Sequence, residues 1–276
     1  MNDNFIIEYL RCPCCKKPMT VANSGTSLVC LGERVHSFDF SSKGYVNLSR
    51  AQSATGDSKE AVRSRSDFLN KGYYAPIAEK LVEILKSYKD VNKVLDAGCG
   101  EGYYTSYVAE AGYLTSGFDL SKFAVASTAS RMNCKRDMRH FAAVASVFEL
   151  PVCDSSTDAV VSIFAPCAEE EFRRVLKDGG LLIVVSAGED HLMGLKRAIY
   201  SEAYRNDARS DMPKNMELDV VHRLKYTVDL SSNEDVLNLF SMTPYYWRTS
   251  QKDKEKLLTI DSLTTEVDVL FSVYKK

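Results

Sequence analysis

The sequence of 276 residues predicts an α/β fold, a doubly wound and mostly parallel sheet, with a small metal-binding module at its N-terminus. Two observations predict it. From residue 93 onward, short apolar runs alternate with stretches of helical length, which is typical of βαβ units. Four of the eight cysteines fall within the first 30 residues. We therefore expect a module over 1–48, a linker and lead-in helix over 49–75, and an α/β domain over 76–276.

The N-terminal cysteines predict a structural zinc site. Cys12 and Cys15 have C-x₂-C spacing, and Cys30 and His36 follow at C-x₅-H. Three thiolates and one imidazole complete a tetrahedral zinc site. Residues 16–29 should form the hairpin between the two pairs. Short strands are expected at FIIEYL, SLVC, HSFDF and GYVNL, which are residues 5–10, 27–30, 36–40 and 44–48.

Two alternatives to this ligand set stay open. The cysteines could be buried thiols beside a surface histidine, and Cys14 is a rival ligand. A segment this small has little apolar core of its own, which favours a metal. The side chain of Cys14 should point away from the partners of Cys12.

The next segment is predicted as a mobile linker followed by a helix. Residues 49–66 are small and polar, which favours a linker. A helix should begin near Asp67 or Pro76, because Ile77, Leu81 and the following apolar residues recur at helical spacing.

From residue 93 the elements alternate in order. The expected strands are KVLDAG, LTSGFDL, FAAVAS, DAVVSIFA and LLIVVSA, and the helices between them are YYTSYVAEAG, SKFAVASTASR and EEEFRRVLKDGG. Ser121 is the expected N-cap of the second helix. The tail should add a strand at YTVDL, a helix at SSNEDVLNLFSM and a last strand at EVDVLFSVYK.

A glycine-rich turn follows the first of these strands. Gly98, Gly100 and Gly102 have G-x-G-x-G spacing, which differs from the G-x-G-x-x-G of dinucleotide sites. Asp96 precedes them and would repel a pyrophosphate, but it suits the cationic methionine end of S-adenosylmethionine. Asp119 ends the next strand, where an acid can accept hydrogen bonds from ribose hydroxyls. The set predicts a class I, Rossmann-like methyltransferase; the alternative is that the glycines form only a tight turn.

Several motifs together resemble one family. They are CPCC at 12–15, KGYVNL at 43–48, GDSKE at 56–60, FLNKGYYAP at 68–76, LDAGCGEGYYT at 95–105, IFAPC at 163–167, HLMGLK at 191–196 and MTPYYWR at 242–248. In this combination the chain is similar to the RlmA-type guanine-N1 methyltransferases of 23S ribosomal RNA, from Cys12 to Arg248. One departure is the five-residue gap between Cys30 and His36.

The resemblance implies the function and several site residues. It implies an S-adenosylmethionine-dependent enzyme that carries zinc and methylates N1 of a guanine in a hairpin of large-subunit rRNA. Tyr74, Tyr104, Thr105 and His191 match positions that contact the cofactor. It is also compatible with a homodimer. The residues by themselves leave structural roles for Tyr74 and His191 equally open.

The substrate side is less defined by the sequence. Phe164 and Pro166 follow the fourth strand and are the expected walls of the base pocket, while no residue can be assigned as the proton acceptor. A formal net charge of −2 argues against RNA binding by bulk attraction alone. The expected phosphate contacts are Lys16, Lys17, Arg34, Lys43, Arg50, Lys59, Arg63 and Arg65.

Composition sets the remaining expectations. No apolar run approaches the roughly 20 residues that cross a bilayer, and residues 1–15 lack the features of a secretory signal. We expect a cytoplasmic protein without a membrane partner. Two other functions stay open: a small-molecule methyltransferase with a purely structural zinc module, and a non-catalytic zinc-dependent RNA-binding protein.

Overall fold

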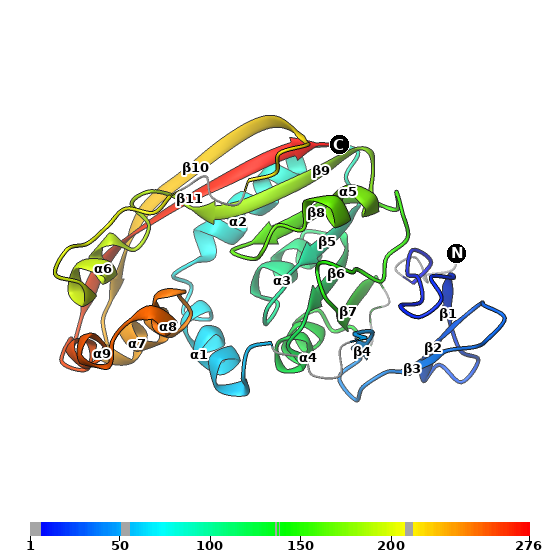
Figure 1. Cartoon of the computed structure of the whole chain (residues 1–276), viewed down its shortest axis with the longest axis horizontal. Coiled ribbons are helices and arrows are strands. Elements are labelled where there is room, and N and C mark those ends of the chain that lie inside the picture. Colours follow the sequence, from blue (N-terminus) through cyan, green and yellow to red (C-terminus); the bar gives the residue numbers. More distant parts are fainter. Residues whose placement is uncertain (1–6, 51–55, 136, 138, 208–211) are drawn as a thin grey trace.

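One eight-stranded sheet organises the chain, in the order β10-β11-β9-β8-β5-β6-β7-β4 (Figure 1). The computed structural model describes residues 7–50, 56–135, 137, 139–207 and 212–276. The strands from β9 to β4 run parallel, and β10 and β11 add antiparallel strands at one edge. The parallel strands are β4 (Val46–Asn47), β5 (Lys93–Ala97), β6 (Leu114–Asp119), β7 (His140–Val144), β8 (Thr157–Ile163) and β9 (Leu176–Ala187). The predicted doubly wound sheet is confirmed.

Both faces of this sheet are covered by apolar side chains. Val94 and Leu95 are neighbours on β5, yet they join different apolar clusters because successive side chains in a strand point to opposite faces. Helix α2 (Ala75–Ser87) covers one face and α5 (Glu169–Val175) the other. Helices α3 (Tyr103–Glu110) and α4 (Lys122–Arg131) complete the crossovers, and Ser121 caps α4 as predicted.

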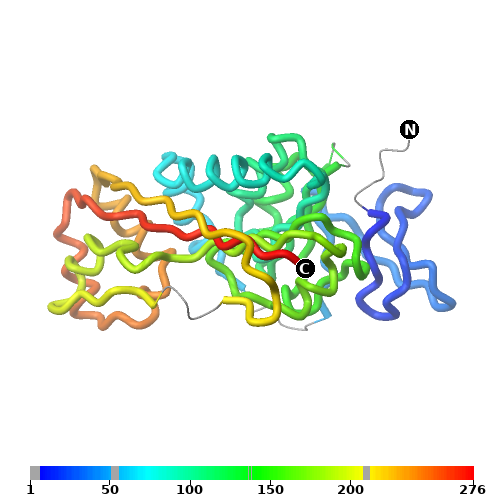
Figure 2. Tube along the Cα trace, turned by 90° about the horizontal axis from the view of Figure 1, so that it is seen from above, coloured from blue at the N-terminus to red at the C-terminus, as the bar shows by residue number. Residues whose placement is uncertain are grey.

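The antiparallel strands carry a group of helices at one end of the molecule. Strands β10 (Glu217–Leu230) and β11 (Leu263–Lys275) pair along their whole length. The helices are α6 (Met193–Ile199), α7 (Asn233–Ser241), α8 (Tyr245–Arg248) and α9 (Gln251–Leu257), called the helical cap here. Figure 2 shows the cap and the N-terminal segment at opposite ends of the long axis.

A three-stranded antiparallel sheet forms the N-terminal module. Its strands are β1 (Met19–Val21), β2 (Ser27–Cys30) and β3 (Ser37–Asp39), so the predicted hairpin is confirmed. The expected strand at FIIEYL is wrong for residues 7–9, which form a turn, while residues 5 and 6 lie outside the described residues. Ile7, Tyr9 and Leu10 of this segment are buried, and Leu10 pairs with Val152 of the larger domain.

The module is not an independent domain. Leu10 and Leu28 are fully buried in the same cluster as Phe118 and Phe172 of the α/β domain. Strand β4, which the sequence assigned to the module, pairs with β7 and forms the edge of the main sheet. The boundary at residue 48 stays a prediction, and residues 1–6 of the module lie outside the described residues.

The interpretation of 49–66 as a mobile linker is wrong for its second half. Helix α1 (Lys59–Leu69) begins there, capped by the Ser58 hydroxyl, which accepts from the Ala61 N–H. Its few apolar residues, Val62 and Phe68 among them, are buried by packing that the local pattern does not reveal. Residues 51–55 lie outside the described residues. The start expected near Pro76 is confirmed by α2, and no helix in the described part could cross a membrane.

Candidate cofactor crevice and zinc site

The turn between β5 and α3 requires its glycines. Gly98, Gly100 and Gly102 have φ of +85°, +55° and +84°, in the left-handed region that favours glycine. A Cβ on Gly98 would lie 2.6 Å from the Cβ of Ala165, and one on Gly102 would lie 2.6 Å from the Cα of Thr128. The turn can therefore approach both neighbouring segments only with a bare backbone.

The side chain of Asp96 is buried, and only one of its two carboxyl oxygens accepts a hydrogen bond from the described residues. Its Oδ2 accepts a hydrogen bond of 2.6 Å from the Thr105 hydroxyl, and its Oδ1 is buried without a partner among the described residues. Burial raises the pKa of Asp96 to about 7. A buried acceptor without a partner costs about 1–3 kcal/mol, and more when charged. The arrangement therefore favours a ligand that brings a cationic donor to Oδ1.

Asp119 is oriented by the backbone at the end of β6. Its Oδ2 accepts from the Gly100 N–H at 3.1 Å, and its Oδ1 accepts from the Ser121 N–H at 2.8 Å. Burial raises the pKa of this carboxyl as well. Each carboxylate oxygen can accept more than one hydrogen bond. Asp119 can therefore accept from two further hydroxyls without losing its anchors.

Helix α1 lies against the glycine turn through Arg65. Arg65 on α1 forms an ion pair of 2.6 Å with Asp57 and lies 3.9 Å from Glu101, which is buried between two of the glycines. The phosphate contact by Arg65 stays a prediction; in this structure its side chain is 23% exposed and is engaged by these acids. The sequence analysis missed Glu101, although its place inside the glycine motif was a signal.

Three rings lie together beside the carboxyl ends of β8 and β9. The ring of His191 is 5.7 Å from Phe164 and 6.3 Å from Tyr74, measured between centroids, and it stacks on Phe164 at 25°. Phe164 has a left-handed φ of +50° and is 45% exposed. Pro166 is also exposed. Tyr104 on α3 is half-buried. Its pKa is raised, first by desolvation and then by the charge of the neighbouring Tyr74 phenol.

His191 is held as a neutral hydrogen-bond donor. Its Nδ1 accepts from the backbone N–H of Asp268 at 3.3 Å, so its proton is on Nε2. Burial lowers the pKa of His191 to about 4, which keeps the ring uncharged near pH 7. Asp268 is itself buried and receives two hydrogen bonds of 2.7 Å from Arg223. The sequence analysis missed Asp268, although an acid within the apolar strand EVDVLFSV was a signal.

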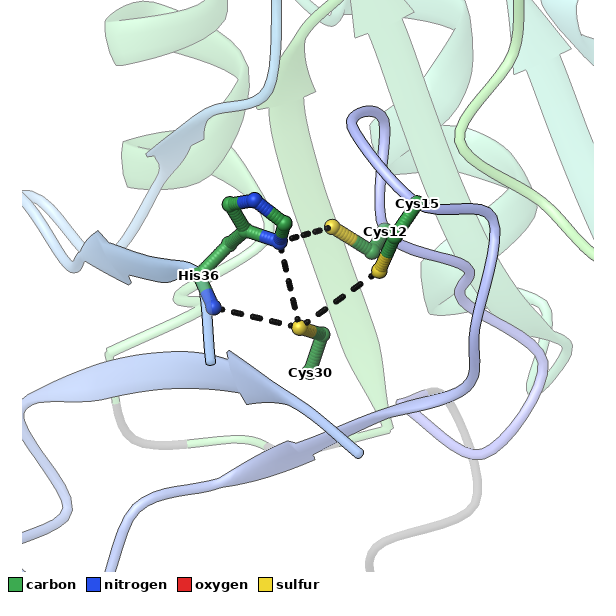
Figure 3. Close-up of side chains that lie close together, drawn as sticks. All are labelled: Cys12, Cys15, Cys30 and His36. Carbon is green, nitrogen blue, oxygen red and sulfur yellow. Dashed lines mark hydrogen bonds between the residues drawn. The ribbon is translucent and has the colours of Figure 1, made fainter. Parts of the chain in front are cut away.

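The predicted zinc ligands converge at the N-terminal module (Figure 3). The ligand atoms of Cys12, Cys15, Cys30 and His36 all lie within 4.8 Å of one another. The Sγ atoms of Cys15 and Cys30 are 3.6 Å apart, and Nδ1 of His36 is 3.4 Å from the Cys30 Sγ. Tetrahedral ligands at about 2.0–2.3 Å from zinc are about 3.3–3.8 Å apart. The donor set and its spacing fit a structural zinc ion with no open position.

The thiols of this site differ in their surroundings. Burial raises the pKa of Cys12 to about 11, whereas the His36 N–H, which donates to the Cys30 Sγ at 3.1 Å, lowers the pKa of Cys30 to about 6. Cys14 is exposed and is not among the converging ligands, as expected. The five-residue gap between Cys30 and His36 is accommodated by the turn at 31–36.

The other expected phosphate contacts fall into two groups. Lys16 lies 2.6 Å and Arg50 3.5 Å from Glu149, and Arg63 lies 3.6 Å from Asp67, so each has an acidic neighbour. The second group is exposed and forms no ion pair with any described residue; it consists of Lys17, Arg34, Lys43 and Lys59.

Comparisons with known proteins cover both regions. The model of a methyltransferase domain matches residues 95–184, and the model of the RlmA N-terminal zinc ribbon matches residues 10–54. A Bacillus subtilis protein, YxjB, is named as a candidate 23S rRNA (guanine-N1) methyltransferase; it is 31% identical over 280 residues, which cover 95% of this chain and 96% of the relative. The 23S rRNA (guanine(748)-N1) methyltransferase of Streptomyces fradiae is 31% identical, over 88% of this chain and 87% of its own.

Solved structures also resemble part of this chain. The YcgJ protein of Bacillus subtilis is 15% identical, with a TM-score of 0.49, over 72% of this chain and 98% of its own.

Proposed function

Because this chain belongs to the RlmA-type 23S rRNA (guanine-N1) methyltransferase family, we propose that it transfers a methyl group from S-adenosylmethionine to N1 of a guanine in a hairpin of 23S rRNA. One observation supports this most directly. The same chain joins a three-cysteine, one-histidine zinc site to a crevice whose buried Asp96 oxygen has no partner among the described residues. A small-molecule enzyme would not need the first feature, and a non-catalytic RNA-binding protein would not need the second.

The glycine turn supports the cofactor assignment. S-adenosylmethionine supplies a methyl group on a positively charged sulfur, and its amino group can donate to Asp96 Oδ1. Asp119 accepts from the ribose hydroxyls while the backbone holds it in place. Thr105 keeps the Asp96 carboxylate in one orientation. The glycines, Tyr74, Tyr104 and His191 complete the proposed cofactor site.

The proposed site for the guanine lies at the exposed face of Phe164. Its ring is free for stacking on one side because His191 packs on the other. Pro166 is exposed two residues further along the same loop and gives a second wall. Transfer to nitrogen requires alignment of N1 with the methyl group, and positioning of this kind can supply much of the acceleration. His191 does not remove the N1 proton in this scheme, since its Nδ1 already accepts from Asp268.

A guanine must leave its base stack to reach such a crevice, which favours a loop or bulge over a regular duplex. The exposed cations of the zinc ribbon, Lys17, Arg34 and Lys43, are proposed phosphate contacts.

An rRNA substrate implies that the enzyme acts in the cytoplasm, where ribosomes are assembled. A homodimer that forms a joint RNA cleft is also proposed, and light scattering in solution tests it.

Transfer of a radioactive methyl group tests the function. Ribosomal RNA from a strain lacking the gene should accept the label from S-adenosylmethionine, and mapping should place it on N1 of one guanine. Asp119→Ala should weaken cofactor binding strongly in calorimetry. Labelling of a small metabolite but not of rRNA, or a protein that binds no S-adenosylmethionine, would contradict the proposal.

A further inference from the structure

The one-turn helix α8 exposes one of its rings and partly buries another. Trp247 is 83% exposed, the highest value among the large apolar side chains of the described residues. Tyr245 of the same turn is half-buried, and its hydroxyl donates to Asn206 Oδ1 at 3.0 Å. Asn206 in turn donates to the carbonyl oxygen of His191. Helix α8, which carries the exposed Trp247, is therefore joined through Tyr245 and Asn206 to His191 in the wall of the crevice.

The segment around this helix is held rigidly. Lys196 is fully buried, and its Nζ donates to the Tyr204 carbonyl at 2.8 Å and to Asn206 Oδ1 at 2.7 Å. The ammonium group also lies 4.4 Å from the ring centroid of Tyr204 and 5.1 Å from that of Tyr245. Burial of a cation without a carboxylate partner costs free energy unless hydrogen-bond acceptors and aromatic ring faces surround it, as the Tyr204 carbonyl, Asn206 and the two tyrosine rings do here. The rings of Tyr204 and Tyr245 are thus held beside the buried ammonium group, and Trp247 follows Tyr245 by two residues.

Two exposed cations accompany the exposed rings. Tyr204 is 50% exposed, and Arg248 lies near it. Burial raises the pKa of Tyr204, and the positive charge of Arg248 partly opposes that rise. Arg248 and Lys252 are exposed and form no ion pair with any described residue. Tyr204, Trp247, Arg248 and Lys252 are called the aromatic rim here. Rings interleaved with exposed cations match a partner with both phosphates and base faces.

The reaction itself supplies such a partner. When a guanine turns out of its stack, the nucleotides beside it lose a stacking neighbour, and an aromatic side chain can replace it. We propose that the aromatic rim binds an unpaired nucleotide next to the target guanine, with Trp247 stacked on its base and Arg248 on its phosphate. This inference rests on the proposed function, because it names how the same RNA is held.

Trp247 is the only tryptophan of the chain, so intrinsic fluorescence reports on it alone. Titration of the full-length protein with an rRNA hairpin that it methylates should quench the emission. Trp247→Ala should raise the Kd for the hairpin and the KM of methylation about tenfold, within the range for one stacked base. Trp247→Phe should keep both within about threefold, since a ring remains. In both variants kcat and the affinity for S-adenosylmethionine should be unchanged.

Leu258→Ala is the matched control, because Leu258 is 62% exposed and follows α9 in the same cap. It should leave the Kd for RNA unchanged. Normal methylation of rRNA without quenching, and with an unchanged KM in Trp247→Ala, would overturn the inference and leave the proposed function standing. A Trp247→Ala variant that shifts the oligomeric state but not RNA binding would identify a protein interface instead. Absence of any methylation of rRNA by the wild type would contradict the proposed function itself.

Discussion

The zinc ribbon and the cofactor crevice place polar groups in opposite situations. In the ribbon, all four ligand atoms come from the 25 residues between Cys12 and His36, and each lies close to the others. In the crevice, the groups come from segments as distant as Arg65 and Asp268, and one oxygen of Asp96 has no partner among the described residues. The ribbon holds a complete set of ligand atoms, whereas the crevice leaves a buried carboxyl oxygen without a partner among the described residues, which we propose the cofactor supplies.

The two regions should therefore respond differently to mutation. Loss of a zinc ligand removes a stabilising interaction from a segment that shares its core with the α/β domain. Loss of the Asp96 charge removes a group whose burial disfavours the folded state. The first change should therefore cost stability, and the second should cost ligand binding while the protein becomes more stable.

The largest effect is expected at the ribbon. Cys12→Ser should abolish zinc binding and lower the free energy of unfolding by about 3 kcal/mol or more, since loss of a metal is among the few severe effects of single substitutions. Because Leu10 and Leu28 pack with Phe118, the loss should reach the α/β domain. Thermal unfolding and the zinc content of the purified protein measure it.

Cys14→Ser is the control for this experiment, because Cys14 is adjacent but exposed and outside the ligand cluster. It should bind one zinc ion and unfold like the wild type. A chelator should reproduce the effect of Cys12→Ser on wild-type protein. Equal loss of zinc in both serine variants would show that the exposed thiol is a ligand and that the geometry at Cys12 is misassigned.

The second effect concerns Asp96. Asp96→Asn should raise the Kd for S-adenosylmethionine about 100-fold, because a charge-assisted hydrogen bond in a buried site is worth about 1.5–3 kcal/mol. The same variant should raise the free energy of unfolding of the ligand-free protein by about 1 kcal/mol at pH 8, since no buried charge remains. Calorimetry and denaturant unfolding measure the two quantities. A variant that loses affinity and stability together would remove the contrast with the ribbon.

A smaller effect is expected from pH. With a pKa of about 7, Asp96 in the free protein holds a proton below that pH, and this proton must leave before a cation can bind. Affinity for S-adenosylmethionine should therefore fall about tenfold from pH 7.5 to pH 6. His191, with a pKa of about 4, stays neutral over this range and should not contribute. Asp96→Asn should show a flat profile, and an unchanged slope would assign the titration to another group.

The same contrast explains what the sequence could predict. The ribbon ligands were identified by spacing, because their positions depend on one hairpin. Asp96, Asp119 and the glycines stay predictions as cofactor residues. Their places in the fold were predictable because Asp119 ends β6 and the glycines lie in the turn between β5 and α3. The order of βα elements was predictable for the same reason, since it rests on local apolar periodicity.

The features that the sequence did not predict depend on contacts between residues that are distant in the sequence. Helix α1 has too few apolar residues for a helical pattern, and its direction toward Glu101 is decided by packing. The role of Asp268 requires the pairing of β11 with β9, which brings its N–H to His191. The shared core of ribbon and domain has no local signal either, because Leu10 meets Val152 only in the folded chain.

The smallest effect compares two neighbouring lysines of the ribbon. Lys17 is exposed without an acidic partner among the described residues, whereas Lys16 lies 2.6 Å from Glu149. A lysine that neutralises one phosphate releases about one counterion. Lys17→Ala should therefore raise the Kd for the rRNA hairpin about threefold at low salt and reduce the salt dependence of binding by about one ion. Lys16→Ala should change either quantity far less, because that charge is already balanced by the protein.

Filter binding over a range of salt concentrations measures both variants, with the zinc content as a check that the ribbon is intact. Equal effects of the two substitutions would mean that the ribbon attracts RNA only through its overall charge. No effect of either would mean that the ribbon stabilises the fold without touching the substrate. In that case the contrast between the two regions would be complete, with recognition of the RNA confined to the crevice and the helical cap.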